Sequence, residues 1–202
     1  MDALPSDIVP IATALERSGW CLLPAFFDVD EIAALAAECR EFDRAASLRP
    51  AATGHGATHA RNGLRGDRTR WFEAQSLSSA QTRYWARMDA LRHTLNRTLL
   101  LGLDELEAHY ALYPPGAGYA RHRDCFRDDD ARVLSTVVYL NEAWQAHDGG
   151  ALRLHLSDGA RDIAPHGGSL VLFLSAEVEH EVLPATRDRL SIAGWFRRRP
   201  AR

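Results

Sequence analysis

The hydrophobic and polar positions of this chain follow two different periods, and the change comes near residue 107. Before it, apolar residues recur at helical spacing in segments 6–19, 28–42 and 78–102. After it, short apolar or alternating runs follow one another, each bounded by Gly, Pro, Asn or Asp. This pattern predicts helices in the first part of the chain and about eight short strands in the second.

Local signals support these boundaries. Asp28 and Glu31 have the spacing of a capping box at the start of the second helix, and Gly19 is a stop signal for the first. Composition assigns the segments between the helices: a short strand within 20–27 that Pro24 ends, a strand at 64–73, and a flexible loop at 48–63. The strands expected in the second part are 107–114, 119–124, 132–141, 149–157, 161–165, 169–176, 180–184 and 189–198.

The succession of strands decides the fold class. No helical pattern separates the strands after residue 107, which argues against a parallel α/β fold, because parallel strands need crossover helices. The pattern predicts a mainly β fold with N-terminal helices: a double-stranded β-helix, or jelly roll, braced by α-helices on one face. We expect one domain over residues 1–202, with helical support at about 1–106 and the jelly-roll core at about 107–199.

Composition narrows the partners and the compartment. The chain of 202 residues is 46% hydrophobic and 25% charged, and its formal net charge of −3 provides no basic field for nucleic acid or an anionic membrane. No apolar run has the length of a membrane span, and the N-terminus lacks the pattern of a signal peptide. The three cysteines have no CxxC spacing, which favours reduced thiols in the cytoplasm. The abundance of Ala and Arg favours a bacterial origin.

Candidate metal ligands come from two places in the strand region. His122 and Asp124 are two residues apart on an expected strand, so their side chains point to the same face. An imidazole and a carboxylate are two of the three ligands of a 2-His-1-carboxylate site, which leaves open positions on non-haem Fe(II). His180, which opens a later strand, is the natural third ligand. A lone HxD pair is common and weak evidence.

A cationic residue follows the last of these candidates. Arg189 lies one strand after His180, in the apolar context "LSIAGWF". A guanidinium beside an open metal site can bind a carboxylate through two hydrogen bonds, and the alternative for Arg189 is a surface salt bridge. A metal chelator with a distal carboxylate describes 2-oxoglutarate. Tyr139 can donate a phenolic hydrogen bond to the same carboxylate.

Several motifs together resemble one family. The segments "YPPGAGYARHRD", "RVLSTVVYLNEAW", "GGALRL" and "VLFLSAEVEHEVLPATRDRLSIAGWF" are similar to the Fe(II)/2-oxoglutarate-dependent prolyl 4-hydroxylases, most of all to the hypoxia-inducible-factor-type branch and its bacterial relatives. Upstream, "LRGDRTRWFE" resembles that branch's RGD…W segment, and "SGWCLLPAFF" its N-terminal strand. The resemblance extends over roughly residues 18–199.

The resemblance implies roles for the candidate residues and names the cofactors. It implies Fe(II) as the metal, 2-oxoglutarate and O₂ as co-substrates, and ascorbate as a reductant. By position, His122, Asp124 and His180 would hold the iron, Arg189 and Tyr139 would bind the distal carboxylate of 2-oxoglutarate, and Tyr113 would line that pocket.

The resemblance also implies a substrate-binding set. Asp67, with Arg65 beside it, and Arg132 match residues that tie a loop before the RGD segment to the barrel mouth. Arg132 and Trp195 would border the target proline, and the loop at 51–62 would fold over a bound peptide.

Two departures from the family pattern concern the pocket. His109 stands where the family usually has an apolar residue, and the turn "YPPGAGY" is one residue shorter. Neither departure changes a candidate ligand.

The expected function is hydroxylation of a prolyl residue in a protein, with elongation factor Tu as a candidate target suggested by bacterial relatives. One alternative is hydroxylation of a free amino acid or metabolite, although the long segment before Arg65 favours a protein substrate. A second is a non-catalytic metal-binding sensor or protein-binding module, against which the intact triad and Arg189 argue. A zinc hydrolase with the same ligands would need a general base, and none is evident in the sequence.

Overall fold

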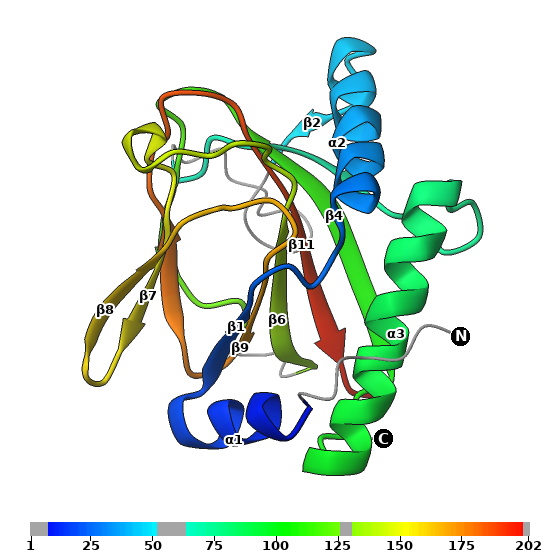
Figure 1. Ribbon diagram of the computed structural model, residues 1–202, viewed down its shortest axis with the longest axis vertical. Helices are drawn as coiled ribbons and strands as arrows, with labels where there is room; N and C mark the ends of the chain where they lie inside the picture. The colour runs from blue at the N-terminus through cyan, green and yellow to red at the C-terminus, as the bar shows by residue number, and fades with distance from the viewer. Residues whose placement is uncertain (1–7, 52–63, 126–130, 200–202) are drawn as a thin grey trace, which may run out of the picture.

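The computed structural model describes residues 8–51, 64–125 and 131–199. The N-terminal half is built around helices, as the hydrophobic pattern predicts (Figure 1). The helices are α1 (Ile8–Ser18), α2 (Val29–Arg44) and α3 (Ser79–Leu99). Short strands lie between them: β1 (Trp20–Leu23), β2 (Arg49–Pro50) and β3 (Arg68–Trp71). None of the described helices is both long and apolar enough to cross a membrane.

The C-terminal half consists of strands, with one short 3₁₀ helix, η2 (Ala146–Asp148). The first strands are β4 (Glu105–Tyr113), β5 (Tyr119–His122), β6 (Arg132–Tyr139) and β7 (Leu152–Leu156). They are followed by β8 (Gly159–Ile163), β9 (Leu170–Leu174), β10 (Glu179–Val182) and β11 (Arg189–Arg197).

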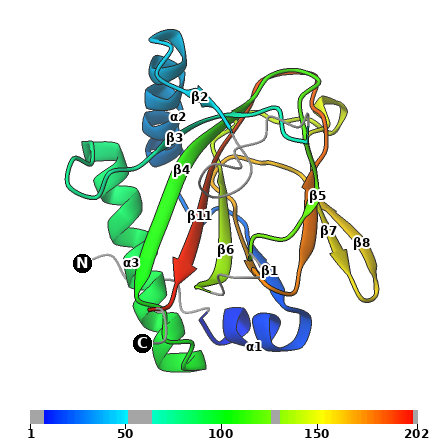
Figure 2. The same ribbon diagram turned by 180° about the vertical axis from the view of Figure 1, so that it is seen from behind.

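The strands form two antiparallel sheets that face each other. The larger sheet has seven strands in the order β1-β9-β6-β11-β4-β3-β2, and the smaller has four in the order β5-β10-β7-β8. Helices α2 and α3 lie along the outer side of the larger sheet, with the smaller sheet on the opposite side (Figures 1 and 2). The predicted jelly roll braced by helices on one face is confirmed.

Alternation along the central strands separates a packing face from a cavity face. On β11, Leu190, Ile192 and Phe196 are buried in the apolar cluster shared with the helices. Each such side chain contributes about 1.5–3 kcal/mol when it leaves water. The alternate residues, Arg189 and Ser191, point to the other face, toward the small sheet. The helices therefore stabilise the large sheet from outside and leave its inner face available for polar chemistry.

The helix starts follow from capping. The Asp28 carboxylate accepts a hydrogen bond from the backbone N–H of Glu31 at 2.8 Å, and the Glu31 carboxylate accepts one from the N–H of Asp28 at 3.1 Å. This confirms the predicted capping box. Ser78 and Gln81 form a second one at the start of α3. Each cap is worth about 1 kcal/mol of helix stability.

Three strand predictions need correction. Of the expected strand at 64–73, only Arg68–Trp71 forms β3, because Gly66 donates its N–H to Gly118 and so joins the turn after β4. Within the expected loop at 48–63, residues 49–50 form β2, and residues 52–63 lie outside the described ranges. Strand β5 ends at His122, so Asp124 follows the strand rather than lying on it.

Candidate active site

Strand pairing brings the three candidate ligands together. His122 ends β5, and His180 lies directly opposite it on β10. Asp124 lies two residues beyond β5, with Oδ1 at 3.5 Å from His122 Nε2 and Oδ2 at 3.6 Å from His180 Nε2. One ligand atom from each residue lies within 4.8 Å of the others, a spacing suited to a single metal ion.

Backbone carbonyls fix the orientation of both imidazoles. Nδ1 of His122 is 2.8 Å from the carbonyl oxygen of Ala120, and Nδ1 of His180 is 3.3 Å from that of Val178. Because a carbonyl can only accept, each Nδ1 carries the hydrogen and donates it. Each Nε2 therefore keeps its lone pair on the side of Asp124, as a metal ligand requires.

The charge state of the cluster also suits a divalent cation. Burial raises the pKa of Asp124, but the two imidazoles and the Ser135 hydroxyl outweigh burial and hold that pKa well below its usual range. Ser135 Oγ donates to Asp124 Oδ2 at 2.7 Å and lies 2.9 Å from Ser175 Oγ. Burial lowers the pKa of His180 to about 4, so its imidazole is neutral near pH 7. A carboxylate and imidazoles are ligands that Fe(II) accepts.

Arg189 is a buried cation that lacks a counter-ion among the described residues. It is 1% exposed, and its Nε donates to the carbonyl of Gly150 at 2.8 Å. Nη1 donates to Ser191 Oγ at 3.3 Å, whereas Nη2 has no hydrogen-bond partner. A buried charge without a partner is costly, which indicates that an anion belongs here.

Two tyrosines complete this end of the site. The rings of Tyr113 and Tyr139 lie 5.3 Å and 5.2 Å from the guanidinium carbon of Arg189. The Tyr139 hydroxyl is buried and, like Arg189 Nη2, has no partner among the described residues. Burial raises the pKa of Tyr139 to about 12, against the opposing effect of Arg189, so the phenol keeps its proton. The two unpartnered donors fit the distal carboxylate of 2-oxoglutarate.

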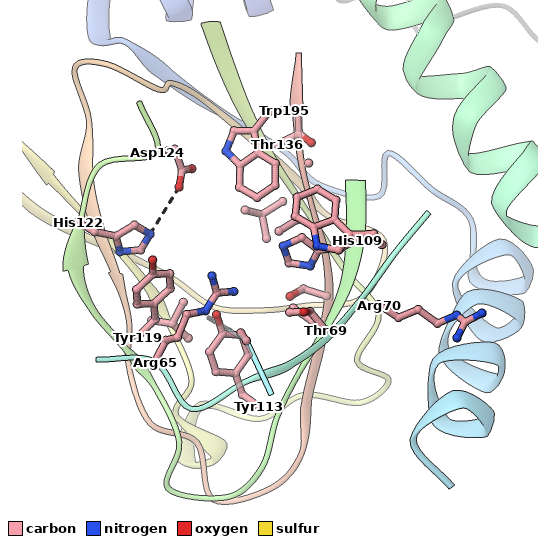
Figure 3. Close-up of a pocket in the computed structure, with 18 of the residues that line it drawn as sticks. Arg65, Thr69, Arg70, His109, Tyr113, Tyr119, His122, Asp124, Thr136 and Trp195 are labelled. Carbon is pink, nitrogen blue, oxygen red and sulfur yellow. Dashed lines mark ion pairs between the residues drawn. The ribbon is translucent and has the colours of Figure 1, made fainter. Parts of the chain in front are cut away.

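One cavity of about 670 Å³ joins this closed end to the metal ligands and to the surface. Between Arg189 and the outer rim, the large sheet lines the cavity with small side chains that leave room for a ligand: Ala111, Ser191 and Ala193. Figure 3 shows His122 and Asp124 on one side of the cavity, and His109 and Trp195 on the other. The metal ligands and Arg189 therefore line one and the same cavity.

The expected substrate-binding residues form two separate groups of contacts. Arg65 donates two hydrogen bonds to Asp67, at 2.7 Å and 2.6 Å. Arg132 forms an ion pair of 2.7 Å with Glu107, and its guanidinium carbon lies 3.8 Å from the ring centroid of Trp195. Asp67 and Arg132 therefore hold separate partners, and residues 52–62 of the loop that they were expected to tie lie outside the described ranges.

Sequence reasoning missed the residues that support the site from neighbouring strands. Ser135, which donates to Asp124, comes from β6, and Ser175, whose hydroxyl lies beside that of Ser135, comes from just beyond β9. The ring of Tyr119 stacks on His122 at 3.6 Å between centroids. The inward alternation of segment 132–141 could have singled out Ser135, but nothing in the sequence marks Ser175.

Residues 108–197 match the family model described as the 2OG-Fe(II) oxygenase superfamily. The crystal structure of a Pseudomonas putida prolyl-4-hydroxylase is 48% identical to this chain, with a TM-score of 0.87. The match covers 96% of this chain and 100% of that one. The chain belongs to this superfamily. Its resemblance to the prolyl 4-hydroxylases is thereby confirmed, and its cofactors are Fe(II) and 2-oxoglutarate.

Other relatives are less identical in sequence to this chain than the Pseudomonas putida enzyme, and some of them are much longer than this chain. A Trichoplax adhaerens prolyl hydroxylase, solved with a peptide fragment of the hypoxia-inducible factor oxygen degradation domain, is 26% identical over 93% of this chain and 87% of that chain, with a TM-score of 0.82. The hypoxia-inducible factor prolyl hydroxylase of Caenorhabditis elegans is 40% identical over 94 residues, which are 44% of this chain and 13% of the relative. Human Egl nine homolog 1 is 31% identical over 141 residues, 66% of this chain and 33% of the relative. This chain therefore spans less than half the length of these two curated relatives.

Proposed function

We propose that this protein hydroxylates a prolyl residue in a protein or peptide, consuming O₂ and 2-oxoglutarate and releasing succinate and CO₂. The observation that carries the proposal is a pair of buried donors, Arg189 Nη2 and the Tyr139 hydroxyl, that have no partner within the described part of the chain. They lie at the closed end of a cavity that also holds His122, Asp124 and His180. The prolyl hydroxylases among the relatives support the choice of proline as the target.

In this proposal His122, Asp124 and His180 hold the iron. When bound, iron and 2-oxoglutarate supply the oxidising chemistry that places a hydroxyl group on the substrate carbon. The protein's own task is positioning: the carbonyls of Ala120 and Val178 set the imidazole tautomers, and Ser135 holds the carboxylate.

The closed end orients the co-substrate. Arg189 and Tyr139 donate to its distal carboxylate, while the ring of Tyr113 packs beside the guanidinium. Apolar side chains of the buried cluster that contains Tyr113 and Tyr139 exclude water from the cavity, including Leu152, Val171 and Phe173. Water exclusion strengthens the ion pair between Arg189 and the bound carboxylate.

The open end suits a protein substrate better than a metabolite. Arg132 and Trp195 stack at the rim, and the neighbouring Trp71 is 49% exposed, an unusual exposure for so large an apolar side chain. We propose Arg132, Trp195, Asp67 and Arg65 as the substrate-binding set. A translation factor such as elongation factor Tu is a candidate substrate. Cys21 and Cys39 are buried thiols outside any disulfide, which fits action in a bacterial cytoplasm.

The test compares the proteome of a host lacking this gene with the same host complemented by the wild type or by Asp124→Ala. We expect one or more proline residues to carry a mass increase of about 16 Da only with the wild type, because loss of a ligand costs several kcal/mol of transition-state stabilisation. Succinate production by the purified variant should fall on the order of a thousandfold. Turnover retained by Asp124→Ala would show that another carboxylate is used. A mass shift on a metabolite instead of a protein would favour the small-molecule alternative.

A further inference from the structure

His109 lies in the wall of the cavity, between two tryptophans. It is an inward residue of β4, and Trp71 of β3 lies opposite it in the strand register. Its ring is 4.7 Å from the ring of Trp71 and 5.6 Å from that of Trp195, measured between centroids. Only 2% of the residue is exposed. The two indoles therefore hold the imidazole in one place on the cavity wall (Figure 3).

The hydrogen-bonding state of this imidazole follows from its neighbours. Nδ1 of His109 lies 3.0 Å from the carbonyl oxygen of Tyr110, which can only accept, so Nδ1 carries the hydrogen. Burial, with smaller effects of the charges of Arg65 and Arg132, lowers the pKa of His109 to about 4, against the opposing effects of the Tyr110 carbonyl and Asp67. The ring is thus neutral near pH 7, and Nε2 is an acceptor without a partner among the described residues.

An apolar side chain would fill this position at lower cost. His109 lines the cavity, so an occupant that displaces water from Nε2 without donating a hydrogen bond to it costs about 1–3 kcal/mol, a penalty that a methionine between two indoles would not carry. The faces of Trp71 and Trp195 give His109 no hydrogen bond through Nε2. The imidazole is therefore explained by a group that reaches the cavity from outside and donates to Nε2.

This wall adjoins the metal ligands. Trp195 is the strand partner of Ser135, which donates to Asp124. The indole Nε1 of Trp195 is also buried without a partner among the described residues, and in Figure 3 it points toward the side where Asp124 lies. The wall thus presents one acceptor and one donor to the cavity, and the backbone of a bound peptide carries N–H and C=O groups that can pair with them.

The chemistry of the peptide substrate limits which of its N–H groups can donate to His109 Nε2. Under the proposed function, a peptide around a proline enters the cavity. Proline has no backbone N–H, so the target residue itself cannot donate to His109. The residues before and after the proline do carry one.

We propose, resting on the proposed function, that His109 is a specificity-determining residue whose Nε2 accepts a hydrogen bond from the backbone N–H of a residue next to the target proline. Through this contact the enzyme recognises the backbone next to the proline as well as the proline ring. It also favours peptides over free amino acids and metabolites, which lack that N–H.

The experiment compares the wild type with His109→Gln and His109→Met. The two substituted side chains have the same length, but only Gln keeps an acceptor near the position of Nε2. The probe is a pool of short synthetic peptides with one central proline and randomised flanks. In two matched pools an ester oxygen replaces the N–H of the residue after, or before, the proline, which removes the donor without adding bulk.

We expect the wild type to hydroxylate one ester pool roughly three- to tenfold more slowly than the amide pool, the effect of one neutral hydrogen bond. His109→Gln should keep most of this difference, and His109→Met should treat all pools alike. Affinity for 2-oxoglutarate, unchanged in both variants, checks the fold. The comparison within the wild type needs no variant at all.

Equal wild-type rates on the amide pool and both ester pools would overturn the proposal, and so would a preference that survives in His109→Met. Absence of hydroxyproline from every pool would remove the proposed function, and this inference with it. That result is distinct from hydroxylation at an unchanged ratio, which would remove the hydrogen bond alone.

Discussion

The closed end of the cavity and its open rim lie on the inner face of one sheet, yet they are built from different groups. At the closed end, Arg189 and Tyr139 are buried and each keeps a donor without a partner among the described residues. At the rim the rings of Trp71, His109 and Trp195 pack together, and Trp71 is 49% exposed. One end is shaped for a single small anion, and the other presents an extended surface.

This difference separates two recognition tasks. A buried anion needs fixed donors, because a charge left unpaired in the interior costs several kcal/mol. A peptide surface needs apolar area with a few placed polar atoms, such as His109 Nε2 and Trp195 Nε1. Variants at the closed end should therefore change the affinity for 2-oxoglutarate, and variants at the rim should change the behaviour toward peptide.

The largest expected effect concerns the rim and protein stability in acid. His109 has a folded-state pKa of about 4, below its ordinary value of 6.5. Between these values the unfolded chain binds a proton that the native protein does not, so the free energy of unfolding falls as the pH falls through this window. Relative to His109→Met, the wild type should lose roughly 3 kcal/mol between pH 6.5 and pH 4.

Urea unfolding at a series of pH values measures this loss. His147→Met is the matched control, because that side chain is 83% exposed on η2 and its replacement should leave the wild-type pH profile unchanged. Parallel profiles for the wild type and His109→Met would mean that the imidazole titrates normally, and that the rim is more hydrated than its burial indicates.

At the closed end, Arg189→Met should weaken 2-oxoglutarate binding by roughly a hundredfold, the effect of losing a buried charge-assisted pair. The same change should not destabilise the ligand-free protein, because it removes a buried cation that lacks a counter-ion among the described residues. Calorimetric titration measures the affinity, and thermal unfolding measures the stability.

Arg187→Met provides the control for that experiment. Arg187 lies two residues earlier and its side chain is 43% exposed, so its loss should leave the affinity for 2-oxoglutarate intact. A stability loss in Arg189→Met without a change in affinity would assign Arg189 a purely structural role.

The smallest effect is expected between the two ends. Ser135→Ala removes the hydrogen bond of 2.7 Å to Asp124, and the loss of such a supporting contact weakens metal binding by about tenfold. Titration with Mn²⁺, a substitute for ferrous iron, measures the change. Ser157→Ala, at an exposed position, is the control. Unchanged Mn²⁺ affinity in Ser135→Ala would show that Ser135 does not support the ligand.

The jelly roll and the candidate ligands could be predicted from the sequence because both produce patterns among residues that are near one another in the chain. Alternating strands marked the fold, and the order of His122, Asp124, His180 and Arg189 marked the site. The strand assigned to Asp124 was wrong, although the residue still turns toward both imidazoles, because the chain bends just after β5.

Other features depend on strand register, which the local pattern does not contain. Trp71, His109 and Trp195 meet only because β3 and β11 flank β4. Ser135 reaches Asp124 only because β6 faces the end of β5 across the cavity. These residues are separated by long stretches of chain, so their contacts could not be derived from the spacing of residues along it.

The contact between Ser135 and Asp124 crosses from one sheet to the other. Ser135 belongs to β6 of the seven-stranded sheet, whereas Asp124 continues from β5 of the four-stranded sheet. Separation of the two sheets at the open end of the cavity would break the hydrogen bond from Ser135 to the Asp124 carboxylate. The seven-stranded sheet therefore supports a metal centre whose three ligands all lie on the four-stranded sheet or directly follow its strand β5.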